Sequence, residues 1–402
     1  MRVLQIANDF AGSKVHGNLF QWLDSKGIGQ VIYCPVRDPK QIGGNSFEGK
    51  RTHIVYSYII KPYHKFVYHI KRRNLYKDLV AKVDVKRIDL VHAATLFSDG
   101  GLAYKLYRQH GIPYVVAVRN TDINDFLRKL PNTWWDGIQI LLHAERVFFI
   151  SQGLKRRFEN HFLVRPFLDK VKSRFVLMPN GIDAYFHEHI FHERRAEKRV
   201  VYVGDFSDNK NVVRLGEAIL RLRQEKGFEE TVLTIVGGGN NETDTVMKMI
   251  KAHPEVFHYL GKIYDKAQLC EVFRTNNVFA MPSIHETFGL VYVEALSQNL
   301  PVLYTRGEGI DGLFPESVGI GVNPLSVEEI SDALRKLLAD RSFYSNSQID
   351  FSQFRWEWIA EKYIAHYKAI LGLPDVDEQL LQSYVPGASQ NAEENDSVFN
   401  GT

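Results

Sequence analysis

Short apolar runs that predict buried strands alternate with helical segments along most of this 402-residue chain. The alternation occurs twice, first from a strand at residues 2–7 to one at residues 175–177, and again from a strand at residues 200–204. Such alternation predicts a parallel sheet with helices on both faces. Two series of this length therefore predict an α/β protein with two doubly wound domains.

The stretch at residues 278–304 is the most informative part of the second series, because it predicts strand, loop, helix and strand in succession. Glu286 lies in the loop, and Glu294 lies about two turns into the helix. The first amides of a helix have no partner within it and favour a bound phosphate. Here those amides belong to Phe288, Gly289 and Leu290, and Gly289 has no side chain to block a close approach.

The sequence P-S-x-x-E-T-F-G followed by V-E-A-L resembles the E-x7-E signature of retaining glycosyltransferases with the GT-B fold, chiefly glycosyltransferase family 4. Two Glu eight residues apart would occur about once by chance in a chain of this length. The surrounding residues, and a P-N-G-I-D sequence at residues 179–183 that resembles the family's interdomain junction, therefore carry the resemblance. It covers residues 1–373 and implies two Rossmann-like domains facing across a cleft.

The resemblance also implies how the chain divides. Residues 1–185 would form an N-terminal acceptor-binding domain, and residues 199–350 a C-terminal nucleotide-sugar-binding domain. A last helix at residues 351–373 would cross back to the first domain. Residues 374–402 hold six acidic and no basic residues, so the rest of the chain carries +9 against the overall +3. This acidic, polar tail is expected to be disordered.

The activity implied by the resemblance is transfer of a sugar from a UDP- or GDP-sugar to a glycan or lipid-linked saccharide, with retention of configuration. This is a hexosyltransferase-type reaction (EC 2.4), expected to serve cell-surface polysaccharide synthesis. Lys210 matches the family's diphosphate-binding Lys and would stabilise the leaving group. Glu286 would hold donor-sugar hydroxyls, and Glu294 the two ribose hydroxyls. The other expected donor contacts are Phe288, Gly289, Leu290, Gly12, Gly204, Lys262 and Ile263, the last two reading the base through backbone groups.

Two positions depart from the family pattern. Arg119 stands where many members have a His facing the donor sugar, and Asp205 stands where they have the Arg that accompanies Lys210. An acidic side chain would repel a diphosphate at close range, so either Arg119 or Arg306 compensates or donor binding differs from the family's. Arg119 is placed with the catalytic candidates because a guanidinium binds phosphate or an acidic acceptor. The neighbouring candidates for binding acceptor hydroxyls are Asn120 and Asp122.

Neither a cofactor nor a metal ion is expected. The chain has two Cys residues, and its 15 His residues show no HExxH spacing. The one dense group, His187, His189 and His192, predicts a solvated linker rather than a metal site. No G-x-G-x-x-G sequence occurs, so a dinucleotide fingerprint is not supported.

Residues 50–73 hold seven Lys and Arg and no acidic residue. Apolar positions at Tyr63, Phe66, Val67 and Ile70 recur at helical spacing, which predicts an amphipathic surface helix for an anionic membrane. The alternative is a helix that packs this stripe on its own domain. No nucleic-acid motif accompanies the charge. The sequence has no signal peptide and no apolar run of about 18 residues, so a cytoplasmic protein is expected, at the inner face of the membrane.

Two other functions remain open. Asp205 and Arg119 are compatible with a catalytically silent GT-B protein that binds a sugar nucleotide or a glycan. A GT-B sugar-nucleotide epimerase is the second alternative, and it would need acid/base carboxylates but no acceptor site. The sequence leaves the base, the sugar, the acceptor and the linkage open.

Overall fold

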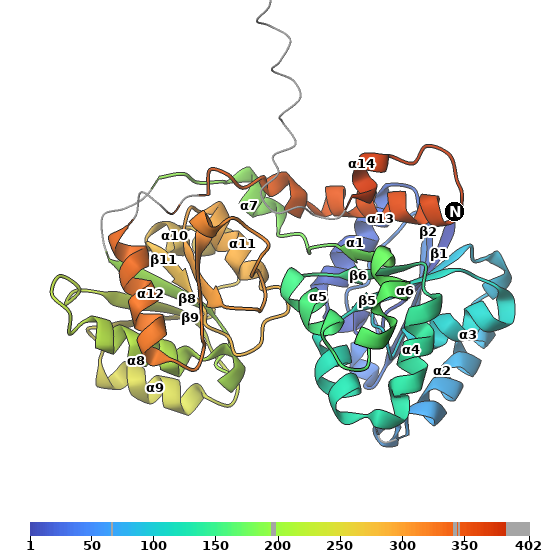
Figure 1. The fold of residues 1–402 in the computed structure, drawn as a ribbon, viewed down its shortest axis with the longest axis horizontal. Coiled ribbons are helices and arrows are strands. Elements are labelled where there is room, and N and C mark those ends of the chain that lie inside the picture. Colours follow the sequence, from blue (N-terminus) through green and yellow to red (C-terminus); the bar gives the residue numbers. More distant parts are fainter. Residues whose placement is uncertain (66, 194–197, 341–343, 345, 383–402) are drawn as a thin grey trace, which may run out of the picture. The chain divides into compact units, whose positions relative to one another are not determined.

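The computed structural model describes the chain except for residues 66, 194–197, 341–343, 345 and 383–402. It forms two compact units, each built on its own parallel sheet (Figure 1). Unit 1 comprises Met1–Ile150, Leu154–Gly181 and the described chain from Trp356 onward. Unit 2 comprises Ser151–Gly153 and Ile182–Arg355.

The sheet of unit 1 has seven strands in the order β3-β2-β1-β4-β5-β6-β7, and each neighbouring pair is parallel. The strand order reverses between β1 and β4. Ligands of doubly wound sheets bind outside the carboxyl ends of the strands at this reversal. The strands are β1 (Arg2–Ile6), β2 (Gly29–Val36), β3 (Thr52–Tyr58), β4 (Leu90–Ala93), β5 (Tyr114–Val118), β6 (Arg146–Phe149) and β7 (Phe175–Leu177).

Helices cover both faces of this sheet, which is why β4 and β5 are buried at every residue. Helices α1 and α13 pack together on one face, and α2, α3 and α4 contact one another in turn. The helices of unit 1 are α1 (Lys14–Ser25), α2 (Tyr68–Lys82), α3 (Gly100–His110), α4 (Trp134–His143), α5 (Gln152–Glu159, in this unit from Leu154 onward), α6 (Leu168–Val171), α13 (Trp356–Ile370) and α14 (Glu378–Leu381).

Unit 2 repeats the same construction with six strands in the order β10-β9-β8-β11-β12-β13, all parallel. Its order reverses between β8 and β11. The strands are β8 (Arg199–Gly204), β9 (Val232–Gly237), β10 (Phe257–Gly261), β11 (Val278–Ala280), β12 (Val302–Thr305) and β13 (Gly319–Val322). The helices are α7 (Ala184–Glu188), α8 (Val212–Leu222), α9 (Thr243–Ala252), α10 (Lys266–Arg274), α11 (Leu290–Ser297) and α12 (Val327–Ala339).

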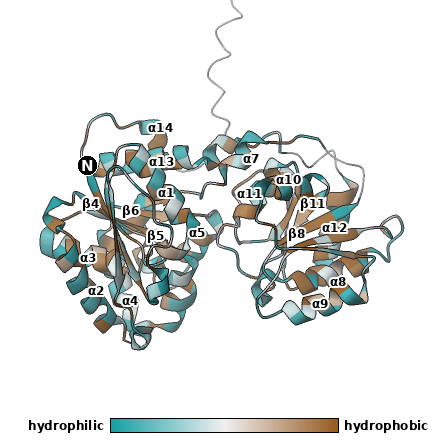
Figure 2. Cartoon of the chain, turned by 180° about the vertical axis from the view of Figure 1, so that it is seen from behind, coloured by the Kyte–Doolittle hydropathy of each residue, from teal (hydrophilic) through white to brown (hydrophobic). Residues whose placement is uncertain are grey.

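Hydrophobic residues concentrate on the strands and on the helix faces that cover them (Figure 2). Of the helices in the described ranges, none combines the length and the apolar character that crossing a bilayer requires. The last described element, α14, places a short helix in the tail that was expected to be disordered. Residues 383–402 of that tail lie outside the described residues.

The basic segment does not form the single helix expected from Tyr63 onward, so that prediction is wrong, whereas its contact with a membrane stays a prediction. Its first part is the edge strand β3, and α2 begins only at Tyr68. Tyr63 lies in a 3-10 helix before α2, and Phe66 lies outside the described residues. The face that α2 buries in unit 1 is formed by Tyr68, Leu75, Tyr76 and Leu79. The alternative, a helix packed on its own domain, describes α2 correctly, although Ile70 on this helix is half-exposed.

The segment expected to be a solvated linker is partly structured. His187 lies in α7, is buried, and its Nε2 lies 3.1 Å from the carbonyl oxygen of Phe354. Burial lowers the pKa of this imidazole, which keeps it neutral. His187 therefore fixes the chain that follows the interdomain junction, rather than remaining in solvent.

Helix α13 completes the core of unit 1. Trp356, Tyr363 and Tyr367 are buried against α1 and the sheet, and the Tyr367 hydroxyl lies 2.7 Å from Nδ1 of His92 on β4. A Cβ added at Gly181 would lie 2.7 Å from the Trp356 ring. The glycine of P-N-G-I-D is thus required by this close contact and not by its backbone conformation, since its φ is not positive.

Replacing Trp356 by Ala should lower the free energy of unfolding of the intact chain by about 3–5 kcal/mol, because it removes a large buried side chain. Denaturant unfolding followed by circular dichroism measures the change. Trp135→Ala is the matched control, since Trp135 is 68% exposed and its loss should have little effect. Equal destabilisation by both substitutions would contradict the assigned role of α13.

Candidate active site

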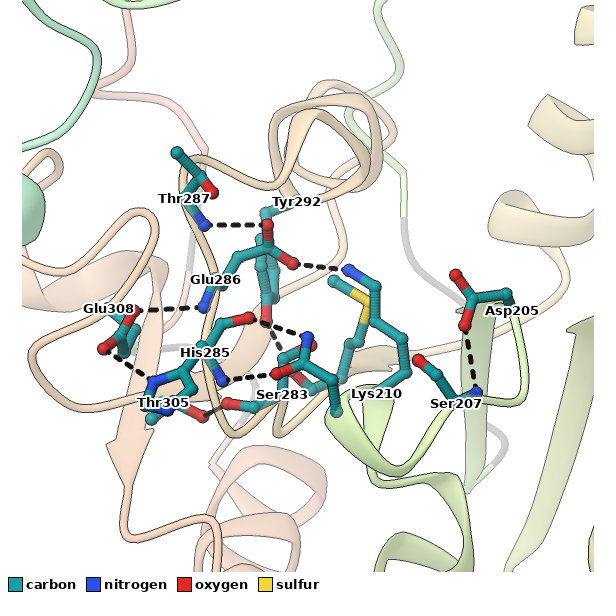
Figure 3. A network of polar contacts seen from close by, with 12 residues as sticks. Asp205, Ser207, Lys210, Ser283, His285, Glu286, Thr287, Tyr292, Thr305 and Glu308 are labelled. Atoms are coloured by element: carbon teal, nitrogen blue, oxygen red, sulfur yellow. Dashed lines mark hydrogen bonds and ion pairs between the residues drawn. The ribbon is translucent and has the colours of Figure 1, made fainter. Parts of the chain in front are cut away.

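The loops that leave β8 and β11, the two strands at the reversal of the unit 2 sheet, meet through an ion pair. Lys210 is the last residue of a 3-10 helix (Asp208–Lys210) after β8, and Glu286 lies in the loop between β11 and α11. Lys210 Nζ lies 2.6 Å from Oε2 of Glu286 (Figure 3). Their side chains are 22% and 12% exposed, so the pair is largely shielded but open to a ligand. Sequence reasoning predicted both residues and not this contact.

Asn209, next to Lys210, fastens the same two loops together. Its carboxamide accepts from the His285 N–H at 3.0 Å and donates to the His285 carbonyl at 2.9 Å. Its own carbonyl accepts from the Ile284 N–H at 2.7 Å. This three-bond clamp sets the position of Glu286, and no sequence motif indicated it.

Glu286 is held from its backbone as well. Its N–H donates to Oε2 of Glu308 at 3.0 Å, and its carbonyl accepts from the Gly309 N–H at 2.8 Å. Its Oε1 accepts from the Thr287 N–H at 3.0 Å. One carboxylate oxygen thus faces the ammonium and the other faces the backbone. Glu308 was missed because only the Gly-rich composition of residues 305–312 marked this loop.

Helix α11 begins beside this pair and presents free backbone donors. Within the part of the chain that the structure describes, the N–H groups of Phe288, Gly289 and Leu290 donate to no protein acceptor. Gly289 has φ 76°, and a Cβ there would lie 2.4 Å from the Tyr292 ring. Only glycine suits this position, and the resulting turn exposes donors of the kind that hold phosphate groups.

Glu294 lies further along α11 and is buried. Its Oε1 lies 3.4 Å from Nζ of Lys266, the first residue of α10. Burial raises the pKa of Glu294, and the nearby Asp183 adds to this effect, while Lys266 opposes it. The Glu294 carboxylate is therefore a shielded hydrogen-bond acceptor, and Lys266 is the cation that favours its charged form. Sequence reasoning did not identify Lys266.

Asp205 is not directed at the ion pair. Its carboxylate accepts from the Ser207 N–H at 2.9 Å and from the Asn240 amide at 3.3 Å. Figure 3 shows this carboxylate bonded to the Ser207 N–H, with no contact drawn from it to Lys210 or Glu286. Asp205 thus stabilises its own turn, and the repulsion expected from the sequence is reduced. Arg306 pairs with Glu329 and donates to the Gly321 carbonyl, so it is already occupied.

The remaining donor candidates in unit 2 lie at the same edge of the sheet. Gly204 ends β8, and a Cβ on the neighbouring Gly237 would lie 1.7 Å from the Gly204 carbonyl oxygen. Gly237, the last residue of β9, is therefore explained by this close strand contact. Lys262 and Ile263 follow β10, where Lys262 is exposed and Ile263 is half-buried.

Unit 1 has a polar cluster at its own reversal of strand order. Asp9, after β1, pairs with Nε2 of His16 at 3.2 Å. Burial alone would raise the pKa of Asp9, but His16 and Arg119 lower it to about 2. Arg119 follows β5 and donates through Nε to the Ala94 carbonyl at 3.2 Å. Asp9 and His16 were not predicted. Gly12, close by, has open space where a Cβ would point.

A fully buried carboxylate lies behind this cluster. Asp99 accepts from the Asn8 amide at 2.9 Å and from the Thr95 hydroxyl at 3.0 Å. Burial, with a contribution from Asp9, raises the pKa of Asp99 to about 7. It positions Asn8 at the sheet edge and lies too deep to contact a ligand.

Asp122 has a different role from the one expected. It is fully buried, and its carboxylate accepts from the N–H groups of Leu96, Phe97 and Arg119. Burial raises its pKa to about 6. These bonds join the loops after β4 and β5, so a structural role replaces the expected binding of acceptor hydroxyls. Asn120 is half-buried in the same loop.

Two family models match consecutive parts of the chain. "Glycosyltransferase Family 4" matches residues 14–186, and "Glycosyl transferases group 1" matches residues 187–352. The chain is a GT-B glycosyltransferase of family 4. The two matches together span residues 14–352, which include the unit 2 site and Arg119 of unit 1, but not Asp9 or α13.

Relatives and solved structures agree with this membership. The glycosyltransferase is 32% identical to sulfoquinovosyl transferase SQD2 of Arabidopsis thaliana over 35% of the chain and 27% of that protein. It is 22% identical to a Bacillus subtilis protein named "Putative teichuronic acid biosynthesis glycosyltransferase TuaC", over 66% of the chain and 63% of that protein. The matched stretches are thus about a quarter and under two thirds of these relatives. A sucrose-phosphate synthase from Thermosynechococcus elongatus superposes with a TM-score of 0.69 at 17% identity, over 92% and 99% of the two chains, and shows the same fold.

No group of three or more His, Cys, Asp or Glu side chains in the described ranges is arranged to hold a metal ion. Two lysines of the glycosyltransferase's unit 2 site, Lys210 and Lys266, are each paired with a carboxylate. Lysine ammonium groups beside free helix amides can bind a diphosphate.

Removing the Asn209 clamp should loosen the active-site loop without unfolding unit 2. In Asn209→Ala, amide hydrogen exchange at residues 284–290 should become faster, because two side-chain hydrogen bonds that hold the loop are lost. Sugar-transfer kcat/KM should fall about tenfold to a hundredfold from misplacement of Glu286. Asn323→Ala, which loses one hydrogen bond in a loop after β13, is the control and should change neither quantity. Unchanged exchange in Asn209→Ala would refute the clamp.

Proposed function

We propose that this glycosyltransferase moves a sugar from a UDP- or GDP-sugar, held by unit 2, to a saccharide acceptor with retention of anomeric configuration. The observation that carries the proposal is the Lys210–Glu286 ion pair beside the free amides of α11. The pair supplies one group of each kind that the donor needs: a cation for its diphosphate and a carboxylate for its sugar hydroxyls.

Donor binding would exchange the partners of this pair. The diphosphate takes the Lys210 ammonium and the N–H groups of Phe288, Gly289 and Leu290. The Glu286 carboxylate, released from Lys210 but still held by the Thr287 N–H, accepts hydrogen bonds from the sugar. The Lys210 ammonium and the helix N–H groups are fixed before the reaction. They face the atoms where negative charge develops as the diphosphate leaves, and hydrogen-bond donors at that place lower the barrier most.

Retention and metal independence follow from the same proposal. The leaving phosphate takes the proton of the acceptor hydroxyl on the face from which it departs, so no enzyme nucleophile is needed. Lys210 and the helix amides neutralise the leaving group in place of a divalent cation. Arg119 of unit 1 contributes positive charge on the acceptor side, next to Asp9.

The acceptor is proposed to be a glycan or lipid-linked saccharide of a cell-surface polysaccharide, at the inner face of the membrane. The name of the Bacillus subtilis relative, which refers to teichuronic acid, supports a polysaccharide. The basic segment supports a contact with anionic lipid. Tyr63 and Ile70 in this segment are 53% and 50% exposed, and apolar side chains among Lys and Arg suit a headgroup layer.

A donor panel tests the proposed reaction. Wild type should release nucleotide from one UDP-, GDP- or ADP-sugar, and transfer to an acceptor mixture should give a product with the donor's anomeric configuration by NMR. EDTA should leave the rate unchanged. Glu286→Ala should abolish release, and Lys210→Met should lower kcat about 10²–10³-fold by removing a donor to the leaving group. Glu230→Ala, at an exposed turn, is the control. Nucleotide binding without release from any donor would contradict the proposal.

Glu294 should make nucleotide affinity depend on pH. Because its pKa is raised above 4.5 in the folded protein, it takes up a proton at a higher pH than an ordinary Glu does. Its carboxylate is the form that accepts from two ribose hydroxyls, so affinity should fall as the pH decreases, with a midpoint above 4.5. Calorimetric titration with the identified nucleotide between pH 8 and pH 5 measures this. The decrease should be absent in Glu294→Gln, and an identical decrease in that variant would assign it to another group.

A further inference from the structure

Unit 1 contains a basic pocket that the proposed donor chemistry does not use. It has a volume of about 200 Å³ and is lined by Arg37, Ile60, Lys61, Pro62, His64 and Lys71. Arg37 follows β2, residues 60–62 follow β3, and Lys71 lies in the first turn of α2. The pocket is thus at the carboxyl edge of the sheet, where ligands of doubly wound domains bind.

The cations of this pocket lack anionic partners. Neither Arg37, Lys61 nor Lys71 forms an ion pair with a carboxylate among the residues that the structure describes. The lining itself contains no Asp or Glu. Lys82, also on α2, illustrates the contrast, because its Nζ lies 2.8 Å from Asp78.

His64 does not add a further charge. It is buried, its Nδ1 accepts from the Lys61 N–H at 3.1 Å, and its Nε2 lies 3.3 Å from the Asn74 side-chain amide. Burial and the charges of Lys71 and Lys61 lower its pKa, so the ring is neutral. It fixes the turn that presents Lys61, whose Nζ also lies 4.0 Å from the centroid of the Tyr58 ring. The three cations have no carboxylate partner among the described residues and are open to an anionic ligand.

Lys71 shows most directly that the pocket suits an anion. Its side chain is partly buried, and burial lowers its pKa, with a further contribution from the nearby Arg37. Asp99 acts in the opposite direction, but it is enclosed by Asn8 and Thr95. Two like charges held together with only the buried Asp99 as a counter-charge are costly, and a bound dianion would reduce that cost.

We propose that this pocket binds a phosphate group carried by the acceptor saccharide. A phosphate offers three acceptor oxygens and up to two negative charges, which match the Arg37 fork and the ammonium groups of Lys61 and Lys71. Ile60 and Pro62 provide an apolar wall for the carbon skeleton beside the phosphate. The inference rests on the proposed function, because it assigns the substrate class of the acceptor side.

The pocket also relates to the polar cluster of unit 1. Lys71 interacts electrostatically with Asp99, which in turn holds Asn8 at the end of β1. An acceptor anchored by its phosphate at Lys71 would therefore extend along the sheet edge toward Asn8, Asp9 and Arg119. The phosphate would thus anchor the acceptor, while the polar cluster would contact its hydroxyls.

Calorimetry with the full chain tests the pocket, with glucose 6-phosphate as the probe and glucose as its uncharged counterpart. Wild type should bind glucose 6-phosphate and not glucose. Lys71→Met and Arg37→Met should each weaken this binding about tenfold or more, since each removes a charge-assisted contact. Lys77→Met, an exposed position on the same helix, should bind as wild type. Arg37 is exposed in a loop, so its replacement leaves the core of unit 1 intact.

The remaining variants separate this inference from the donor site. Lys210→Met should retain glucose 6-phosphate binding, and Lys71→Met should retain nucleotide binding. Crystals soaked with tungstate should show the anion between Arg37 and Lys71. Equal phosphate affinity in wild type and Lys71→Met, or tungstate only beside Lys210, would overturn the proposal. Binding to phosphatidic acid vesicles that depends on Lys71, without binding of the soluble phosphate, would assign the pocket to a lipid headgroup and also overturn it.

Discussion

The ion pair between Lys210 and Glu286 is the contact on which the active site of unit 2 depends. It joins the loops after β8 and β11, which the reversal of strand order places next to each other although the residues are 76 positions apart. A largely buried pair is costly unless other hydrogen bonds support it. Asn209, Glu308 and the Thr287 N–H provide that support, so the loop is ordered before a ligand arrives.

Unit 1 uses the same architecture for a different electrostatic purpose. In unit 2 Lys210 and Lys266 each have a carboxylate partner, which the proposed donor would displace. In unit 1 the carboxylates Asp99 and Asp122 are withdrawn into the fold and bind side chains or backbone amides. Its basic pocket is therefore left with unpaired charge. In the proposed function, unit 2 exchanges the partners of its lysines when the donor binds, whereas unit 1 adds an anion to cations that have no carboxylate partner.

Much of the fold could be predicted because buried parallel strands are continuous apolar runs, as β5 shows. Strands β3 and β13 were missed, because β3 lies at an edge and mixes Tyr and His with apolar residues, and β13 contains two glycines. The family motif identified Glu286, Lys210 and Glu294. It could not show that Asn209 and Glu308 hold the loop, since such contacts depend on how distant turns meet. Asp122 was misassigned for the same reason, because only packing reveals which amides surround a carboxylate.

Helix α13 has a consequence for how the protein is made. The hydroxyl of Tyr367 meets His92 across 275 positions of sequence, so the core of unit 1 stays open on one face until nearly the whole chain has been synthesised. Unit 2, by contrast, consists of the continuous stretch Ile182–Arg355 and the short earlier segment Ser151–Gly153. It can therefore fold as soon as it leaves the ribosome. The order of translation therefore opposes the usual order of folding, in which the N-terminal domain is finished first. During that delay, the apolar surface later covered by Trp356 and Tyr363 is exposed to chaperones and to other nascent chains.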